Sequence, residues 1–197
     1  MALAHFKTIS DATDLPLIVF QYPLATGQGY PAATLERLFD EVPTIRAIKD
    51  WTPLVPQHES QIRALQGRAR PINVLSTNSA WLLSSLVLGC NGLLSGSGSV
   101  IADLQAKLFR AVKLNDLAEA RRLNDRIYPM ARVFYADPFI DMHNRMKEAL
   151  VLLGKLPRAV VRPPLVKITE AEIARIRDAL IEAGLLGSET ARGRDAA

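Results

Sequence analysis

Short apolar runs alternate with longer amphipathic stretches over the first 115 residues of this 197-residue chain, and this alternation most restricts the folds it can adopt. Runs of strand-like composition occupy residues 15–23, 44–49, 71–76 and 92–96, and helical patterns follow them at 31–42, 56–67, 79–89 and 99–114. A further helical piece is expected at the N-terminus. The strand-like runs are apolar on both faces, which is typical of parallel strands covered by helices. The pattern therefore predicts an α/β fold, in which βα units surround a parallel sheet.

The rest of the chain has a different pattern, because no strand-like run follows residue 115. Helices are predicted within 116–135, 139–156 and 169–187, with a proline-containing extended connector at 158–168. Thr169 and Glu172 form a capping box at the start of the last helix. We therefore predict a first domain at 1–115, a helical appendage at 116–187 and a disordered tail at 188–197.

Composition and charge exclude several kinds of protein. The net charge of +4 is spread along the chain, so we expect no nucleic-acid partner. Cys90 is the only cysteine, which excludes an intramolecular disulfide, and without clustered Cys and His residues no metal site is expected. No stretch approaches the roughly 18 consecutive apolar residues that span a bilayer, and the first residues lack the apolar segment of a signal peptide. A cytoplasmic protein without a membrane partner is therefore expected.

Lys49 closes the strand-like run IRAIKD, where a charged residue is unusual. Alternation along a strand places Lys49 on the face of Ala47, and Asp50 on the opposite face. If the Lys49 face lines a barrel, its amine stands at the rim where the strands end, which is where such barrels do chemistry. Desolvation there would lower the pKa of the amine and make it a nucleophile toward a carbonyl carbon. The alternative is a rim charge that pairs with Asp50 or a neighbouring carboxylate.

An ordered set of motifs extends from His5 to Gly187: HFKTISDATDLPLIVFQYPLATG, IRAIKD, VLSTNSAWLLSSLVLGCNGLLSGSGS, VRPPL and EIARIRDALIEAGLL. In sequence and spacing this set resembles the dihydrodipicolinate synthase and N-acetylneuraminate lyase superfamily. The resemblance implies a (β/α)8 barrel with a C-terminal helical region, usually homotetrameric, whose strand-six lysine forms a Schiff base with pyruvate or another 2-keto acid. It implies a class I lyase or aldolase that makes or breaks a carbon–carbon bond or removes water. No cofactor is expected, because the amine itself supplies the electron sink.

By this resemblance Lys49 matches the Schiff-base lysine, and Asp50 matches a common neighbour of that lysine. Because Asp50 points to the opposite strand face, we expect its role to be structural. The family has a proton-relaying tyrosine at the end of strand five, in a motif like YNVPxxTG, whereas FQYPLATG has Phe20 at that position. Tyr22 lies two residues later on the same strand face, so we hypothesise that its hydroxyl replaces the missing one. The alternative is that Tyr22 only packs at the rim.

Further substrate-binding candidates follow from the resemblance at the ends of the next two strands: Ser76, Thr77, Leu94 and Ser95. In the family the backbone of these segments lies close to the substrate, and Phe20 belongs to the same expected site. The alternative is that these residues only make tight turns between strand and helix. Roles at the surface or in packing are predicted for the histidines, and Cys90 is predicted to be a small buried residue.

The resemblance also implies that HFKTISDATDLP belongs to the helix after strand four, so the chain would hold about strands five to eight of the barrel. The family's strand-two Gly-Thr-Thr segment, which binds the substrate carboxylate, is absent, as is the tyrosine donated across a dimer contact. We expect a start codon upstream of Met1; a truncated gene product, or two halves that pair to close a barrel, are alternatives.

Two leading functions remain open on this sequence, ahead of an enzyme whose glycine-rich loop at 95–99 would hold a phosphate at the start of the next helix. One is a lyase or aldolase of this superfamily that acts through Lys49 as a homo-oligomer, either a dimer or a tetramer. The other is a truncated, non-catalytic family member that acts as an oligomerisation module, which the presence of Phe20 supports.

Overall fold

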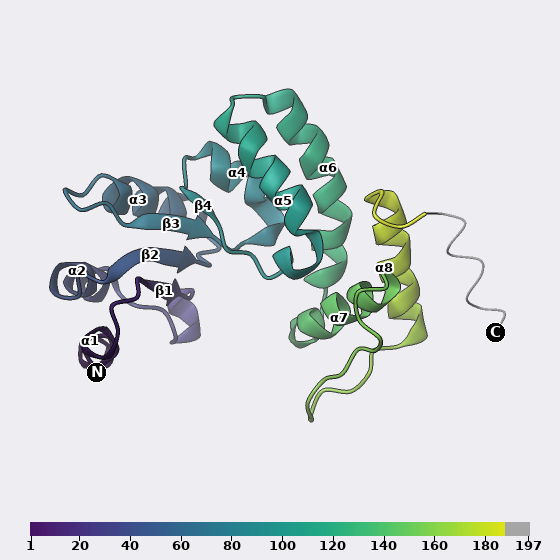
Figure 1. The fold of residues 1–197 in the computed structure, drawn as a ribbon, viewed down its shortest axis with the longest axis horizontal. Helices are drawn as coiled ribbons and strands as arrows, with labels where there is room; N and C mark the ends of the chain where they lie inside the picture. Colours follow the sequence, from purple (N-terminus) through teal and green to yellow (C-terminus); the bar gives the residue numbers. More distant parts are fainter. Residues whose placement is uncertain (188–197) are drawn as a thin grey trace. The chain divides into compact units, whose positions relative to one another are not determined.

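The computed structural model describes residues 1–187 of the chain (Figure 1). These residues form two compact units, one from Met1 to Ser95 and one that begins at Gly96. The first is called the sheet unit and the second the helical unit. The tail predicted at 188–197 lies outside the described residues.

The sheet unit contains a parallel sheet in which strands that follow one another in the sequence are also neighbours in space (Figure 1). Its strands are β1 (Leu17–Gln21), β2 (Ile45–Asp50), β3 (Asn73–Ser76) and β4 (Gly92–Leu93). Its helices are α1 (Ala2–Ala12), α2 (Ala32–Glu41), α3 (Val55–Gln66) and α4 (Leu82–Val87), with 3₁₀ turns at Leu24–Thr26 and Ser79–Trp81. A helix lies in each connection between neighbouring strands, so the predicted α/β fold with a parallel sheet is confirmed.

β1, β3 and β4 are shorter than the sequence pattern predicts, while β2 has the predicted length. β1 begins at Leu17 because Pro16 has no N–H to donate to a ladder, and it ends two residues before Pro23. β4 contains only two residues, although the N–H of Leu94 still donates to the carbonyl of Ser76 at 2.9 Å. The predicted strand at 92–96 is therefore wrong in its second half.

The two faces of the sheet differ in how they are covered. Side chains that point to one face are buried, namely Val19, Gln21, Ile48, Asp50, Val74 and Ser76. Helices α3 and α4 pack against β3, and α2, α3 and α4 contribute buried apolar residues such as Phe39, Ile62 and Leu86. On the other face Ala47 is only 4% exposed, but Ile18 is 48% exposed, and Phe20, Lys49 and Leu75 are partly exposed. The expectation that helices cover the strands therefore applies to one face only, and the second is called the open face.

The helical unit contains four long helices, and its described residues include no strand. They are α5 (Gly98–Lys113), α6 (Leu117–Phe134), α7 (Met142–Leu152) and α8 (Glu170–Glu182), with a 3₁₀ turn at Phe139–Asp141. Helix α6 packs against α5 and α8, and α7 packs against α8. The division after Ser95 places α5 with the helices, whereas the sequence places a boundary at residue 115, which stays a prediction.

The N-terminus of α8 has the cap that its sequence predicts. The Oγ1 of Thr169 accepts a hydrogen bond from the N–H of Glu172 at 3.2 Å. The carboxylate of Asp116 caps α6 in the same way, accepting from the N–H of Glu119 at 3.0 Å. Each cap satisfies one of the N–H groups that a helix leaves unpaired in its first turn.

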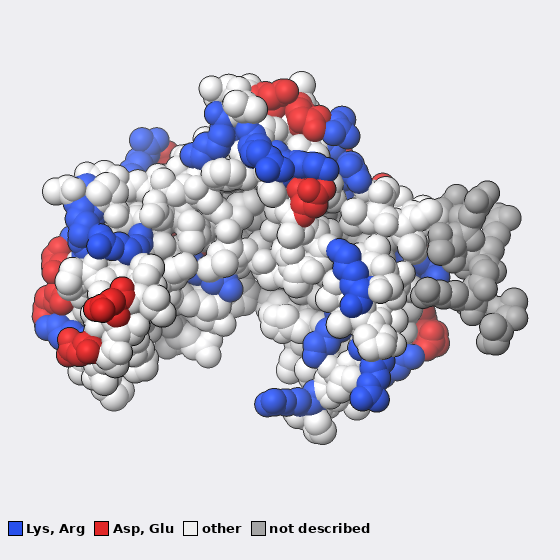
Figure 2. Space-filling view, viewed as in Figure 1, with Lys and Arg blue, Asp and Glu red and all other residues white. Residues whose placement is uncertain are grey.

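Charged side chains of both signs are intermixed on the face shown in Figure 2. Several form pairs one helical turn apart, such as Arg37 with Glu41 at 3.0 Å and Arg122 with Glu119 at 2.6 Å. Exposed pairs of this kind are screened by solvent and contribute little to stability.

Candidate functional site

Lys49 is the penultimate residue of β2 and lies near the C-terminal end of that strand. In the parallel register it stands opposite Phe20 on β1 and Leu75 on β3. All three side chains belong to the open face, while Asp50 points to the face that the helices cover. The strand alternation that the sequence predicts around Lys49 is therefore present.

The amine of Lys49 lies against an aromatic ring. Its Nζ is 4.1 Å from the centroid of the Phe20 ring, a distance at which a cation is attracted by the ring face. Burial disfavours the charged form of this amine and lowers its pKa from the ordinary value of 10.5. A larger fraction of uncharged, nucleophilic amine is therefore available than in an exposed lysine.

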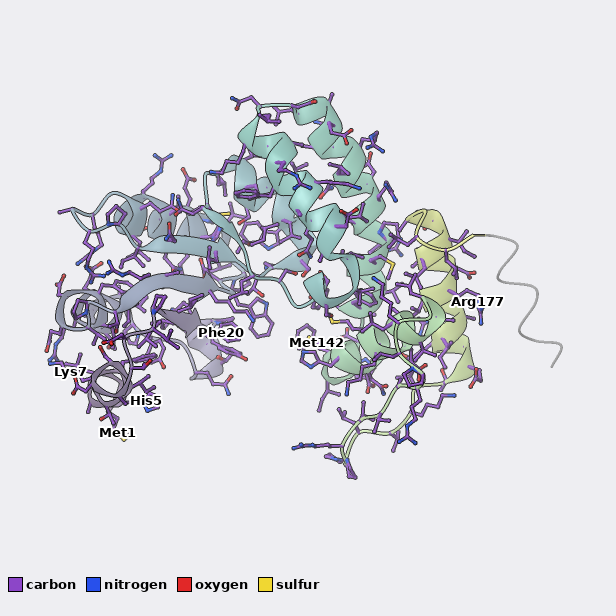
Figure 3. The ribbon with its side chains drawn as sticks, in the orientation of Figure 1. Met1, His5, Lys7, Phe20, Met142 and Arg177 are labelled. Atoms are coloured by element: carbon purple, nitrogen blue, oxygen red, sulfur yellow. The ribbon has the colours of Figure 1, made fainter. Side chains whose placement is uncertain are left out.

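The rings of Phe20, Tyr22 and Trp51 contact one another near the end of β1, and Phe20 is labelled in Figure 3. The centroids of Phe20 and Tyr22 are 4.3 Å apart, and Trp51 meets Tyr22 edge to face at 5.1 Å. Tyr22 therefore lies next to Phe20, as strand alternation predicts. Trp51 is missing from the sequence prediction, although its position two residues after Lys49 places it on the same face.

The alternative pairing of Lys49 with Asp50 does not form. The Asp50 carboxylate lies on the other face, where Oδ1 accepts from the N–H of Thr52 at 2.9 Å and Oδ2 lies 2.6 Å from Nδ1 of His58. Among the described residues no carboxylate is within ion-pair distance of Lys49, and its pKa is lowered by burial alone. Lys49 is therefore a partly desolvated amine with aromatic neighbours.

The remaining predicted residues lie at the ends of β3 and β4. Ser76 is fully buried and stands opposite Asp50, so its side chain points to the helix-covered face, away from the face of Lys49. The N–H of Thr77 donates to the carbonyl of Asp50 at 3.0 Å, which joins the ends of β2 and β3.

At the end of β4, Leu94 is 41% exposed, and the hydroxyl of Ser95 forms a hydrogen bond with the hydroxyl of Ser79. The structure thus places Phe20 against Lys49 and Tyr22 against Phe20, while it directs the Ser76 side chain elsewhere.

A buried polar cluster behind β2 is the part of the site that the sequence does not reveal. His58 on α3 contacts Asp50 through Nδ1, and its Nε2 is 2.6 Å from the hydroxyl of Ser85 on α4. Burial lowers the pKa of His58, but the hydrogen bond and charge of Asp50, with a smaller effect of Cys90, outweigh it and raise the pKa to about 9. His58 is thus a packing residue, as predicted, but one that carries a charge.

Within residues 1–187 no group of three or more His, Cys, Asp or Glu side chains is arranged to hold a metal ion. None of the helices in that range has both the length and the apolar character needed to cross a membrane.

Comparison with known proteins assigns the family. Residues 2–183 match the Dihydrodipicolinate synthetase family. The chain belongs to that family. The resemblance that its motifs predict is therefore confirmed at this level.

Relatives within the family are longer than this chain. The 4-hydroxy-tetrahydrodipicolinate synthase of Nitrobacter hamburgensis is 32% identical over 182 residues, which cover 92% of this chain and 59% of that protein. The enzyme of the same name from Thermomicrobium roseum is 33% identical over 177 residues, covering 89% of this chain and 56% of the relative. The chain thus spans a little under three fifths of the length of these relatives.

Solved structures of the family have the same fold. YagE, a prophage protein of Escherichia coli K12 solved in complex with pyruvate, matches with a TM-score of 0.82 and 28% identity, covering 93% of this chain and 61% of YagE. Dihydrodipicolinate synthase from Thermotoga maritima matches with a TM-score of 0.81 and 25% identity over the same shares of the two chains.

Proposed function

We propose that the chain acts as a lyase or aldolase in which Lys49 forms a Schiff base with pyruvate or another 2-keto acid. The observation that carries the proposal is the Lys49 amine, which lies on the Phe20 ring near the end of a parallel strand, with a pKa lowered by burial. Family membership supports the same chemistry, and the related YagE has been solved with pyruvate bound.

Schiff-base catalysis takes place in three steps at the lysine. The uncharged amine adds to the keto carbon, loss of water leaves an iminium, and the iminium withdraws electrons from the adjacent carbon so that a proton or a carbon–carbon bond there can be released. Partial desolvation of Lys49 favours the first step, because only the uncharged amine is nucleophilic. The reaction needs no group other than the protein's own amine as electron sink.

Tyr22 is our candidate for the proton transfer that follows. Phe20 occupies the position of the family's tyrosine and has no hydroxyl, while the Tyr22 ring lies 4.3 Å from it, centroid to centroid, on the same side of the site. Its phenolic hydroxyl could carry a proton between the substrate and water. Phe20, Thr77, Leu94, Ser95 and the backbone at Ser76 are proposed to line the substrate site.

A partial (β/α)8 barrel is the architecture we propose around this site. Four parallel strands in sequential order, each joined to the next through a helix, are what about strands five to eight of such a barrel would look like. Residues 1–115 would be the barrel part and 116–187 the helical appendage. We further propose a cytoplasmic homo-oligomer, either a dimer or a tetramer, that acts on a small 2-keto acid.

Reductive trapping tests the role of Lys49. The chain is incubated with pyruvate and a panel of 2-keto acids, reduced with borohydride and digested, and the added mass is located by mass spectrometry. We expect an adduct confined to Lys49 that is absent in Lys49→Ala and retained in Lys155→Ala, which removes an exposed lysine. A folded chain that gives no adduct at Lys49 would contradict the proposal.

Exchange of the pyruvate methyl protons with deuterated water tests Tyr22. Tyr22→Phe should still form the adduct but slow the exchange by roughly 10²–10⁴-fold, the usual contribution of a positioned acid or base. Phe20→Tyr in the Tyr22→Phe background supplies a matched control, because it restores a hydroxyl at the family's position. Unchanged exchange in Tyr22→Phe would reduce Tyr22 to a packing residue.

A second candidate is a non-catalytic oligomerisation module. Phe20 in place of the tyrosine favours it, and so does the open face of the sheet, where Ile18 is 48% exposed. This candidate predicts a stable oligomer whose Lys49 does not react with any keto acid. Light scattering on wild-type protein and on Ile18→Lys would support it if the substitution dissociated the oligomer and trapping had failed.

A further inference from the structure

A chain of buried polar side chains connects β2 to helices α3 and α4, on the face opposite Lys49. Asp50, His58 and Ser85 are each at most 1% exposed, and Cys90 is fully buried beside them. The links are 2.6 Å from Asp50 Oδ2 to His58 Nδ1, 2.6 Å from His58 Nε2 to Ser85 Oγ, and 3.4 Å from Ser85 Oγ to Cys90 Sγ. A buried chain of this kind is costly unless every member is satisfied.

Counting hydrogens along this chain fixes the state of His58. The carbonyl of Gly92, 3.5 Å from Cys90 Sγ, can only accept, so the thiol hydrogen is directed to it. The Ser85 hydroxyl then donates its single hydrogen to Sγ and must accept one from His58 Nε2. Because Nδ1 donates to the Asp50 carboxylate, every contact is satisfied only when both ring nitrogens carry a hydrogen.

The same three residue types occur in serine hydrolases, but the placement here does not suit a nucleophile. Ser85 has no exposed surface, and it lies in the packed layer between the sheet and the helices. A hydroxyl that attacks a substrate must be reachable and aligned with its base. The chain of contacts is therefore better suited to holding the backbone than to attacking a substrate.

Asp50 connects this buried chain to the end of β2. Its Oδ1 holds the N–H of Thr52 at 2.9 Å, and its carbonyl accepts from Thr77 at 3.0 Å. Between them the N–H of Trp51 donates to the carbonyl of Gln21 at 3.0 Å. The turn that follows Lys49 is thus fixed on both sides, and Lys49 and Trp51 project from it to the open face.

We propose that Asp50, His58 and Ser85 form a positioning relay that holds the end of β2, so that the Lys49 amine stays on the Phe20 ring and remains partly desolvated. The effect on catalysis rests on the proposed function, whereas the effect on the amine itself does not. The titratable groups that act on His58 are Asp50 on β2 and Cys90 after α4, and both favour the charged imidazole.

Competitive acetylation of lysines tests the relay without a substrate. The full chain is labelled over a range of pH, and the rate at Lys49 is compared with the rate at the exposed Lys155. In His58→Asn, which can still reach Asp50 but not Ser85, we expect the relative rate at Lys49 near pH 8 to fall by at least about threefold, equivalent to half a pKa unit. Ser85→Ala should give a smaller change in the same direction.

The matched control is Ile62→Val, which removes a buried methylene from the same helix, α3, without touching the relay. If Lys49 is acetylated at the same relative rate in folded His58→Asn and Ser85→Ala as in Ile62→Val, the positioning role is wrong.

Nitrogen NMR of His58 in the wild-type chain is a second test of the relay and needs no variant. We expect both ring nitrogens protonated at neutral pH, and a neutral ring there would overturn the relay as described.

Keto-acid trapping on the same variants separates this inference from the proposed function. Where trapping works, His58→Asn should lower the rate of adduct formation more than the affinity for pyruvate, since the amine has moved while the substrate contacts remain. A wild-type chain that traps no keto acid, but whose Lys49 labelling depends on His58, would remove the proposed function and keep the relay. If keto-acid trapping is normal but the labelling of Lys49 does not depend on His58, the proposed function would stand and the relay would be wrong.

Discussion

Among residues 1–187, each unit of the molecule contains an ion pair whose cation is buried, and the two pairs are built differently. In the sheet unit His58 meets Asp50 at 2.6 Å, with both side chains almost fully buried. In the helical unit Arg145 on α7 meets Glu172 on α8 at 3.1 Å, with side chains 2% and 17% exposed. The first pair contains a group that loses its charge as the pH rises through about 9, whereas arginine keeps its charge over the range in which proteins fold.

The surroundings of the two cations explain the difference in residue type. The guanidinium of Arg145 also donates to the backbone carbonyls of Ala136 at 2.5 Å and Asp137 at 3.2 Å, so it holds the chain that leaves α6. A planar group with five donors suits several acceptors at once. His58 has only two ring nitrogens and joins one carboxylate to one hydroxyl, behind the strand that carries Lys49. The Arg145–Glu172 pair connects α7, α8 and the chain after α6. The His58–Asp50 pair can respond to pH, and it lies behind the strand that carries Lys49.

The largest expected effect comes from breaking the pair in the helical unit. Arg145→Met should lower the free energy of unfolding by about 3–5 kcal/mol, because it leaves Glu172 and several carbonyls without their buried donor. Chemical denaturation followed by circular dichroism measures this. Arg175→Met is the matched control, since Arg175 lies 3.8 Å from the same carboxylate but is 65% exposed, and we expect little change. Equal losses in the two variants would remove the distinction between a buried and an exposed partner of Glu172.

The second-largest expected effect is a pH dependence of stability that comes from the His58–Asp50 pair. The pKa of His58 is raised from 6.5 to about 9, so folding takes up a proton and its stabilisation is complete below pH 6.5. As the pH rises through 9 the chain should lose roughly 3 kcal/mol, since one pKa unit corresponds to about 1.4 kcal/mol. Lys49, whose pKa is lowered, acts in the opposite direction and stabilises the fold as the pH rises toward 10.5.

Denaturation of wild-type and His58→Asn protein over this window separates the two contributions. The loss between pH 6.5 and 9 should be present in the wild type and absent in His58→Asn, while Arg175→Met should behave as the wild type. If the loss persists in His58→Asn, another group is responsible for it. The Arg145 pair is expected to contribute no pH dependence in this window.

Strand alternation explains how much of the site could be predicted. A strand has a period of two residues, so Tyr22 could be assigned to the face of Phe20, and Lys49 to one face of its own strand, while the family resemblance supplied the expectation that the two strands share a site. The same rule applied to Trp51 would have found the third ring. The order of βα units likewise predicts the parallel sheet. The lengths of the strands were less predictable, because β4 ends at Leu93 although the apolar run continues to Leu94.

The two buried pairs could not be predicted, and the reason is physical. His58 and Ser85 lie 27 residues apart on different helices, and only the packing of both helices behind β2 brings them together. Arg145 and Glu172 are also 27 residues apart, and nothing in the helical pattern of α7 distinguishes a buried arginine from a solvated one. Local periodicity specifies which face of an element is apolar, but it does not specify which polar side chains meet beneath that face.

The smallest effect concerns the cap of α8, and it tests whether the pair in the helical unit depends on its surroundings. Thr169→Ala should cost about 1 kcal/mol through loss of the hydrogen bond to the N–H of Glu172. Because this cap fixes the residue whose carboxylate Arg145 binds, Thr169→Ala and Arg145→Met should be non-additive by at least about 0.5 kcal/mol. The cap of α6 is the matched control: Asp116→Ala removes an equivalent bond at 3.0 Å but does not hold a partner of Arg145, so its cost should simply add. If the costs were additive in both double mutants, Arg145 would bind Glu172 without help from the cap. The ion pair would then connect α7 and α8 independently of how α8 begins.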